Sequence, residues 1–296
     1  MSSINPDAIH IYKDELQEYD ILKDIITTYK QEDAFYVLDL GIIMKKHQDW
    51  IEKMPRIVPY YAIKCNPNKD LDLMLYGFSF HVGSPCKEFD AYIRGIEVCK
   101  ELITFAKSIR CEDIKLIDIG GGFPGESEYQ IDELSYIIND AIKEIDPTIE
   151  IISEPGRYYV TAAFTLAGYL HSKRTVSNGN SLKQMYYVNC GVYSGFIEEL
   201  LNLNSRQPIS LFKPVSNKEY LSTIWGPTCD SCDCIVKDVL LPEFYIGDWL
   251  VWKDMGAYTT SRVCEFNGFL PPIVHSFIRK SQWKDFCAIT RCDINN

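Results

Sequence analysis

The chain has 296 residues, of which 46% are hydrophobic, so it is long enough for two domains with sizeable cores. Its formal net charge of -11 argues against nucleic acid and anionic membranes as partners. The sequence contains no run of about 20 apolar residues that would span a membrane. Residues 1–7 lack the pattern of a signal peptide and the eleven cysteines form no disulfide framework, so we expect reduced thiols and a cytoplasmic location.

The first half of the chain alternates predicted helices with predicted strands. Helices are expected over residues 11–31, 41–54, 70–76, 89–109 and 129–145, and strands over residues 34–40, 57–64, 77–84, 114–119 and 149–153. Strands that alternate with helices and end in polar or glycine-rich loops indicate a parallel α/β domain. Ligands of such domains bind at the carboxyl ends of the strands.

The pattern changes after about residue 160. Short aromatic and β-branched runs, such as residues 185–189 and 249–252, are separated by Gly, Pro, Asn and Asp. This pattern indicates an antiparallel β domain. We therefore predict an α/β domain over residues 36–160 and a β domain formed by residues 1–35 together with 161–296.

One predicted strand, residues 57–64, ends in a single lysine that is followed by turn residues. Burying an ammonium group without a partner is costly, which leaves two interpretations of Lys64. It is either the first solvated residue after the strand, or a desolvated amine with a lowered pKa that can form a Schiff base.

Three other strand ends carry glycine or polar side chains. The run Gly120–Gly122 would let a phosphate approach backbone N–H groups, or would simply form a tight turn. Glu154 and Arg157 could hold a protonated ring nitrogen and a phosphate, or could form a surface ion pair. His81 and Ser84 follow another strand, where a lone histidine is more often structural than catalytic.

The β domain carries a cysteine-rich segment around Cys229 and Asp230. The spacing of Cys229, Cys232 and Cys234 invites a metal site, but the segment has no second C-x-x-C pair and no nearby histidine. We therefore predict no metal, and favour a thiol placed for proton transfer beside a carboxylate. Taken together, the strand ends supply an amine, a partner for a ring nitrogen, a phosphate cradle with an arginine and a ring-stacking group. These are the parts of a pyridoxal 5'-phosphate site with Lys64 as the Schiff-base lysine.

The same segments resemble the eukaryotic ornithine decarboxylases, in the alanine-racemase-like, fold-type III family of pyridoxal-phosphate-dependent decarboxylases. The matching segments lie in the family's order at residues 59–66, 79–84, 116–125, 154–160, 224–230 and 254–259. The resemblance implies an α/β plus β fold, a pyridoxal-phosphate-binding TIM-like barrel with a C-terminal antiparallel β domain. It also implies decarboxylation of L-ornithine to putrescine, a step of polyamine biosynthesis, by a head-to-tail homodimer with shared active sites.

The resemblance assigns roles to particular residues. It implies that Lys64 binds the cofactor aldehyde, that His81 stacks on the cofactor ring and that Glu154 keeps the ring nitrogen protonated. The cofactor is further held by Ser84, Gly120, Gly121, Gly122, Gly156, Arg157 and Tyr258. Cys229 is implied to return a proton after loss of CO2, and Asp230 to receive the distal ammonium of ornithine.

The sequence departs from the family at one substrate-binding position. Cys190 stands where the family has an aspartate that helps to bind the distal ammonium of the substrate. A buried charge-assisted hydrogen bond contributes roughly 1.5–3 kcal/mol, so its loss predicts a roughly 10- to 100-fold weaker hold on ornithine, or a different substrate.

The sequence also lacks about four βα units of the barrel. Only four barrel strands are expected, ending at Lys64, Ser84, Gly120 and Glu154, and the resemblance makes them the first, sixth, seventh and eighth. Because the eighth and first strands are neighbours, we expect an open sheet in the order six-seven-eight-one rather than a closed four-stranded barrel. A splice form, a gene-prediction omission and a decayed duplicate would all produce this gap.

Three functional hypotheses follow. The first is a pyridoxal-phosphate-dependent ornithine decarboxylase. The second is a catalytically impaired homologue that acts as a binding or regulatory protein, as the antizyme inhibitors do. The third is a truncated isoform without function. Much of the barrel surface that meets antizyme in the family falls in the missing region, which argues against antizyme as a partner.

Overall fold

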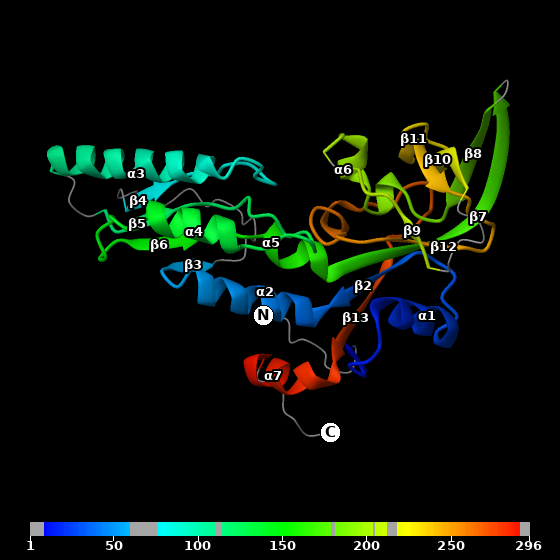
Figure 1. The fold of residues 1–296 in the computed structure, drawn as a ribbon, viewed down its shortest axis with the longest axis horizontal. Coiled ribbons are helices and arrows are strands. Elements are labelled where there is room, and N and C mark those ends of the chain that lie inside the picture. The colour runs from blue at the N-terminus through cyan, green and yellow to red at the C-terminus, as the bar shows by residue number, and fades with distance from the viewer. Residues whose placement is uncertain are drawn as a thin grey trace. The chain divides into compact units, whose positions relative to one another are not determined.

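The computed structural model describes residues 9–59, 76–110, 114–178, 181–203, 205–211 and 218–290 in two compact units (Figure 1). We call Ile43–Thr161 the α/β unit, and Met1–Ile42 together with Ala162–Asn296 the β unit. Lys64 and nearly all of the helix predicted over residues 70–76 lie outside the described residues. In the part of the chain that is described, no helix is long and apolar enough to cross a bilayer.

The α/β unit is built on a four-stranded parallel sheet. Its elements are β3 (Ile57–Pro59), β4 (Gly77–Ser79), α3 (Asp90–Ser108), β5 (Leu116–Asp118), α4 (Asp132–Ala141), β6 (Glu150–Ser153) and α5 (Arg157–Val160), preceded by α2 (Leu40–Lys53). The strand order is β3-β6-β5-β4, and every neighbouring pair is parallel. This is the predicted open order, with β4, β5, β6 and β3 as the sixth, seventh, eighth and first barrel strands. Among the described residues the sheet does not close.

Isoleucine dominates the core of the α/β unit. Ile57, Ile117 and Ile151 lie on adjacent strands and are buried, as expected for β-branched residues in short parallel strands. Helix α3 covers them with Tyr92, Ile96, Cys99, Ile103 and Ala106, which recur every three or four residues and so share one face. This core fixes the relative positions of the strands, and therefore of the loops that follow them.

The β unit contains a nine-stranded mixed sheet. Its elements are β1 (Ile9–Tyr12), α1 (Glu18–Thr28), β2 (Phe35–Asp39), β7 (Phe164–Asn178), β8 (Ser181–Val188), α6 (Ile197–Leu200), β9 (Ile209–Ser210), β10 (Glu219–Trp225), β11 (Cys234–Pro242), β12 (Trp249–Trp252), β13 (Ile273–Arg279) and α7 (Lys280–Thr290), with 3-10 turns η2 (Thr161–Ala163), η3 (Val192–Ser194) and η4 (Thr260–Arg262). The order is β1-β13-β2-β7-β8-β10-β11, while β12 pairs with β7 and β9 pairs with β12.

The β domain is mainly antiparallel, as predicted, but three strand pairs depart from this pattern. The pairs β1–β13, β13–β2 and β8–β10 are parallel. Residue composition identifies strands, but strand direction depends on which distant segments meet, and β13 enters the sheet between two N-terminal strands. The same pairing corrects two boundaries. Residues 9–12 form a strand rather than the start of a helix, and β2 pairs with β7 and β13 instead of starting the α/β unit.

A buried ion triad follows η3 in the β unit. Arg206 Nη1 lies 2.8 Å from Glu199 Oε1, and Arg206 Nη2 lies 2.9 Å from Glu198 Oε2. The Arg206 side chain is only 8% exposed, so its charge is needed to balance the two carboxylates. Burial raises the pKa of Glu199, although the nearby guanidinium opposes this shift. The triad ties Arg206, in the segment after α6, to the carboxylates of α6 itself.

Replacing Arg206 tests the contribution of this triad to stability. We expect Arg206→Met to lower the free energy of unfolding by roughly 3–5 kcal/mol, because two buried carboxylates lose their cation. The control is Lys183→Met, which breaks the more exposed Lys183–Asp238 pair and should cost at most about 1 kcal/mol. Urea unfolding at neutral pH measures both changes. Equal losses in the two variants would contradict the interpretation.

Candidate active site

The loops after three parallel strands meet at one edge of the α/β unit. His81 follows β4, Gly120 and Gly121 follow β5, and Glu154 follows β6. The Glu154 N–H donates to the Gly120 carbonyl at 2.8 Å, and the Gly121 N–H donates to His81 Nδ1 at 3.0 Å. The structure therefore brings together residues that the sequence placed at three separate strand ends.

The glycine run is required by close packing of these loops. Gly120 and Gly122 have φ angles of +67° and +102°, which favour glycine. A Cβ on Gly122 would lie 2.2 Å from the Gly83 carbonyl oxygen, and one on Gly121 would lie 2.6 Å from that of Glu154. The glycines let neighbouring backbones come within contact distance, and they leave the surface of the loop free of side chains.

Asp118 anchors the glycine run and was not singled out from the sequence. This buried carboxylate accepts the Gly120 N–H through Oδ1 at 2.8 Å and the Ser79 hydroxyl through Oδ2 at 3.1 Å. The Ser153 hydroxyl donates to the Gly120 carbonyl at 2.7 Å. The available signal was a lone carboxylate in the apolar run 116–119, where a buried charge requires nearby donors.

The His81 ring is exposed and its orientation is fixed by backbone. Because Nδ1 accepts the Gly121 N–H, the hydrogen of the neutral ring lies on Nε2. The neighbouring Glu154 side chain is also exposed. A planar ligand at this edge could therefore meet the face of an imidazole and a carboxylate from an adjacent loop.

Arg157 supplies a buried cation at the same edge. It begins α5 directly after Gly156, its exposure is 4%, and its Nε donates to the Ser84 hydroxyl at 3.2 Å. Ser84 is exposed, so the pair of guanidinium and hydroxyl lies at the boundary of core and solvent. Such a pair, beside backbone N–H groups, is suited to an anion such as phosphate.

Cys229 and Asp230 lie together on a loop of the β unit. Cys229 is exposed, and the Asn267 side-chain amide donates to its sulfur at 3.4 Å. Asp230 accepts the Cys232 N–H at 2.9 Å and the Tyr193 hydroxyl. These two hydrogen bonds lower the pKa of Asp230. The hydrogen bond between the Tyr193 hydroxyl and Asp230 also raises the pKa of Tyr193 to about 12. The carboxylate therefore stays ionised over the physiological pH range.

Asp233 holds this loop in place and was also missed at the sequence level. Its carboxylate accepts the Val192 N–H at 2.8 Å, the Thr228 N–H at 3.0 Å and the Thr228 hydroxyl at 2.7 Å. Gly191 and Gly226 pack so closely against it that a Cβ on either would lie within about 2.2 Å of Oδ1. The only local signal was the close spacing of Asp230 and Asp233, which does not reveal the partner Val192, 41 residues away in the chain.

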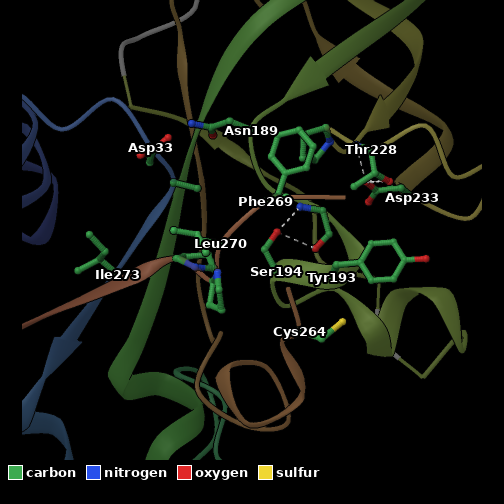
Figure 2. A pocket seen from close by; sticks show the side chains of 16 residues that line it. Asp33, Asn189, Tyr193, Ser194, Thr228, Asp233, Cys264, Phe269, Leu270 and Ile273 are labelled. Atoms are coloured by element: carbon green, nitrogen blue, oxygen red, sulfur yellow. Dashed lines mark hydrogen bonds between the residues drawn. The ribbon is translucent and has the colours of Figure 1, made fainter. Parts of the chain in front are cut away.

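A cavity of about 320 Å³ lies beside the Asp233 carboxylate within the β unit. Figure 2 shows Thr228 and Asp233 on one side and Asp33 and Ile273 on the other, with Phe269 between them. Thr228 donates to the Asp233 carboxylate, which is buried behind this wall, so the wall is rigid next to the Cys229 loop.

Cys190 lies in the core of the β unit. Its side chain has no exposed surface, and a Cβ on Gly168 would lie 2.5 Å from its sulfur. Burial raises the pKa of the thiol, and the charge of Asp233 adds to this effect. Cys190 is therefore a neutral core residue, and the substrate-binding position expected from the sequence is not open to solvent.

The remaining predicted residues are placed as follows. Tyr258 has a φ of +55°, and the Arg262 guanidinium carbon lies 4.5 Å from the centre of its ring. It belongs to the β unit, whereas His81, Ser84, the glycine run, Glu154 and Arg157 belong to the α/β unit. Lys64 lies outside the described residues. Where side chains are described, no three His, Cys, Asp or Glu groups are placed to hold a metal ion.

Comparison with known proteins identifies relatives in sequence and in fold. A family model described as pyridoxal-dependent decarboxylase, C-terminal sheet domain, matches residues 35–256. The chain is 27% identical to mouse ornithine decarboxylase in an alignment that covers 96% of this chain and 90% of that enzyme. The alignment has 416 positions against 296 residues here, so at least 120 positions have no residue of this chain.

Two further matches extend the comparison. Antizyme inhibitor 1 of Pongo abelii is 35% identical over 230 residues, which cover 73% of this chain and 51% of that protein. The arginine decarboxylase of Paramecium bursaria Chlorella virus, solved bound to agmatine, has a TM-score of 0.77 at 24% identity and covers 87% of this chain and 100% of that structure. This structural likeness establishes the fold.

Substitution of Gly122 tests the close packing of the strand-end loops. We expect Gly122→Ala to lower the free energy of unfolding by about 1–3 kcal/mol more than Gly83→Ala. The two glycines have similar φ angles, +102° and +92°, but a Cβ on Gly83 would meet nothing within 4 Å. The difference, measured by urea unfolding, isolates the steric contact from the backbone strain. Equal losses would show that the contact is unimportant.

Substitution of Cys190 tests its burial beside Asp233. We expect Cys190→Asp to destabilise the fold by roughly 3–5 kcal/mol near neutral pH, because it buries a second carboxylate without a cation. Burial raises the folded-state pKa of the new carboxyl group, so the stability loss is smaller at about pH 5 than at about pH 8. The neutral variant Cys190→Ser is the control, and thermal unfolding at both pH values provides the measurement. A pH-independent loss in Cys190→Asp contradicts this placement.

Proposed function

Because the chain belongs to the pyridoxal-dependent decarboxylase family, we propose that it decarboxylates a basic amino acid, ornithine in the first place, to the corresponding amine. The family uses pyridoxal 5'-phosphate as its cofactor. The observation that supports the proposal most strongly is the contact among the loops after β4, β5 and β6. These loops hold His81, Ser84, Glu154 and Arg157 at one edge of a sheet of four described strands, and we propose these side chains as cofactor contacts.

The described residues fit the cofactor group by group. Buried Arg157 and the Ser84 hydroxyl suit the phosphate, because they place a cation and a hydroxyl beside the glycine run, whose Gly120 and Gly121 N–H groups donate to Asp118 and His81. The His81 ring suits a stacking position, because the Gly121 N–H fixes it. The Glu154 carboxylate suits the ring nitrogen. We propose Gly156 and Tyr258 as further contacts, and Lys64 as the residue that binds the aldehyde.

The bound cofactor would act as an electron sink for the electron pair released when CO2 leaves the substrate. We propose that the Glu154 carboxylate keeps a proton on the ring nitrogen, and that the exposed Cys229 thiol donates a proton to the substrate α-carbon. Asp230 would receive the distal ammonium of the substrate. It already accepts two hydrogen bonds, and a carboxylate has about four lone-pair positions, so acceptor capacity remains.

We propose that the working unit is a cytoplasmic homodimer in which the Cys229–Asp230 loop of one subunit serves the cofactor of the other. The exposure of Cys229 supports this assignment, because a proton donor for another subunit must lie at the surface. The ordered hydrogen bonds of Asp233 support it too, because they hold the loop in a fixed shape.

A second candidate function is that of a binding or regulatory protein, like the antizyme inhibitors. It is favoured by the buried, neutral Cys190, which cannot supply the anionic partner of a substrate ammonium. Sequence identity to antizyme inhibitor 1 also supports it. Under this hypothesis the chain would hold the cofactor weakly or release no CO2. Antizyme as its partner stays in question, because the antizyme-binding surface expected in the family falls largely in the missing units.

Trapping of the cofactor on Lys64 tests the proposed site. We expect full-length chain incubated with pyridoxal 5'-phosphate and reduced with borohydride to carry the cofactor on Lys64, located by peptide mass spectrometry. Lys64→Ala should abolish this adduct. Lys107→Ala, a change at an exposed helical lysine of the same unit, should retain it. An adduct spread over many lysines, or its persistence in Lys64→Ala, would contradict the proposal.

Release of CO2 distinguishes the two functions. We expect the cofactor-loaded chain to release labelled CO2 from ornithine faster than from lysine or arginine, and Cys229→Ala to reduce this rate by about 100-fold or more, as expected for loss of a proton donor. Formation of the Lys64 adduct without CO2 release from any of the three would favour the regulatory function.

A further inference from the structure

The segment after η4 forms a tight turn beside the Cys229 loop. The Phe269 N–H donates to the Phe266 carbonyl at 3.0 Å, and these two residues form an antiparallel bridge. The central residues Asn267 and Gly268 have φ angles of +52° and +81°, and positive values at both positions are those of a type I′ turn. Asn-Gly is a sequence that this turn prefers, so the local sequence fixes the backbone that carries the Asn267 side chain.

The turn is held against the residue that also holds Asp230. The Phe266 ring stacks on the Tyr193 ring, with the ring centres 4.1 Å apart and the planes inclined by 16°. The Cys264 N–H donates to the Tyr193 carbonyl at 3.1 Å. The Tyr193 hydroxyl in turn donates to the Asp230 carboxylate. The turn and the loop at Asp230 are therefore fixed to one another through Tyr193.

The turn directs one amide at the Cys229 sulfur. Asn267 Nδ2 lies 3.4 Å from Cys229 Sγ and donates a hydrogen bond to it, although the two residues are 38 positions apart in the chain. In the described part of the chain, this is the one hydrogen bond that the Cys229 sulfur makes. A neutral thiol has one weak S–H donor and accepts through its sulfur. Because the amide occupies the acceptor side, the S–H group is left for another partner.

The same sulfur has an ionised carboxylate as its neighbour in the chain. Asp230 follows Cys229 directly, and its hydrogen bonds with Cys232 and Tyr193 lower its pKa and hold its charge in place. A like charge nearby disfavours a thiolate on Cys229. A hydrogen-bond donor to the sulfur counteracts that repulsion, because it stabilises the charged form. The Asn267 amide is such a donor.

We propose that Asn267 is a positioning residue that prepares Cys229 to give up its proton. This inference rests on the proposed function, in which the Cys229 thiol protonates the substrate α-carbon. In that step the S–H bond breaks, and the proton forms a C–H bond with the electron pair that loss of CO2 leaves on the carbon. The S–H bonding pair stays on the sulfur, which becomes a thiolate. The Asn267 N–H group then donates to an anion, and such charge-assisted hydrogen bonds are roughly twice as strong as neutral ones.

The contact between Asn267 and Cys229 therefore strengthens as charge develops on the sulfur. An interaction of this kind lowers the barrier of the chemical step without tightening the binding of the substrate. Asp230 is held separately, through Tyr193 and Cys232, so loss of the Asn267 amide leaves the proposed ammonium site in place. We expect changes at Asn267 to lower kcat and to leave KM unchanged. A turn that only shapes the loop would displace both Cys229 and Asp230, and its loss would change both constants.

Replacement of Asn267 tests the contact in the full chain without cofactor. Asp-Gly also favours a type I′ turn, so Asn267→Asp keeps the backbone but places a carboxylate beside the sulfur in place of an N–H donor. We expect alkylation of Cys229 by iodoacetamide, located by peptide mass spectrometry, to slow by about tenfold or more, because the thiolate is the reactive form. Asn267→Gly keeps the turn without a side chain, and should slow alkylation by about threefold, as expected for loss of a neutral hydrogen bond.

Two comparisons separate this contact from other effects of the substitution. Asn202→Asp makes the same change at another exposed asparagine of the β unit with a positive φ, +55°, and should alter the rate by about twofold or less. In urea, where residues 229 and 267 are no longer held together, Asn267→Asp and the wild-type chain should react alike. Undiminished alkylation of Cys229 in folded Asn267→Asp, or an equal loss in urea, overturns the proposal.

Release of CO2 from ornithine by the cofactor-loaded chain provides the second readout. Asn267→Asp should lower kcat by about tenfold or more and keep KM within about twofold of the wild-type value. A rise in KM that accompanies the fall in kcat would give the turn a structural role only, and overturns the proposal. If alkylation of Cys229 responds as expected but the wild-type chain releases no CO2, the decarboxylase function fails while the contact that holds the thiol stands.

Discussion

The architecture depends on the alignment of three parallel strands whose carboxyl ends lie at one edge. Asp118 enforces this alignment, because its buried carboxylate is satisfied only when Gly120 and Ser79 both reach it. The glycines then let the loops after β4 and β6 approach within hydrogen-bonding distance. In this way a sheet that lacks half of the expected barrel still presents an imidazole, a carboxylate, a buried guanidinium and a loop without side chains at one place.

In the β unit, too, a buried carboxylate holds separate loops together by hydrogen bonds. Asp233 joins the turn at Val192 to the loop at Thr228, and these donors to its buried carboxylate are uncharged. Burial raises the pKa of the neighbouring Cys190 thiol, and the charge of Asp233 adds to this effect, so the thiol stays neutral. The loss of an aspartate at position 190 is therefore matched by a local environment that would reject one.

The sequence allowed a correct prediction of the open sheet order, because the strand-end motifs identify which barrel strands are present. It also placed His81, Gly121 and Glu154 at neighbouring strand ends, and the structure brings their loops into contact. It did not reveal Asp118 or Asp233, because the partners of a buried carboxylate are set by tertiary contacts. The parallel pairing of β13 escaped prediction for the same reason, since strand direction depends on segments more than 200 residues apart in the chain.

The central claim is that a half-length α/β unit retains a site for pyridoxal 5'-phosphate. Calorimetric titration of the full chain with pyridoxal 5'-phosphate, and separately with pyridoxal, tests this claim most directly. Because Arg157, Ser84 and the glycine run are assigned to the phosphate, we predict one cofactor bound per chain and much weaker binding of pyridoxal. Absence of saturable binding, or equal affinity for the two compounds, would contradict the account.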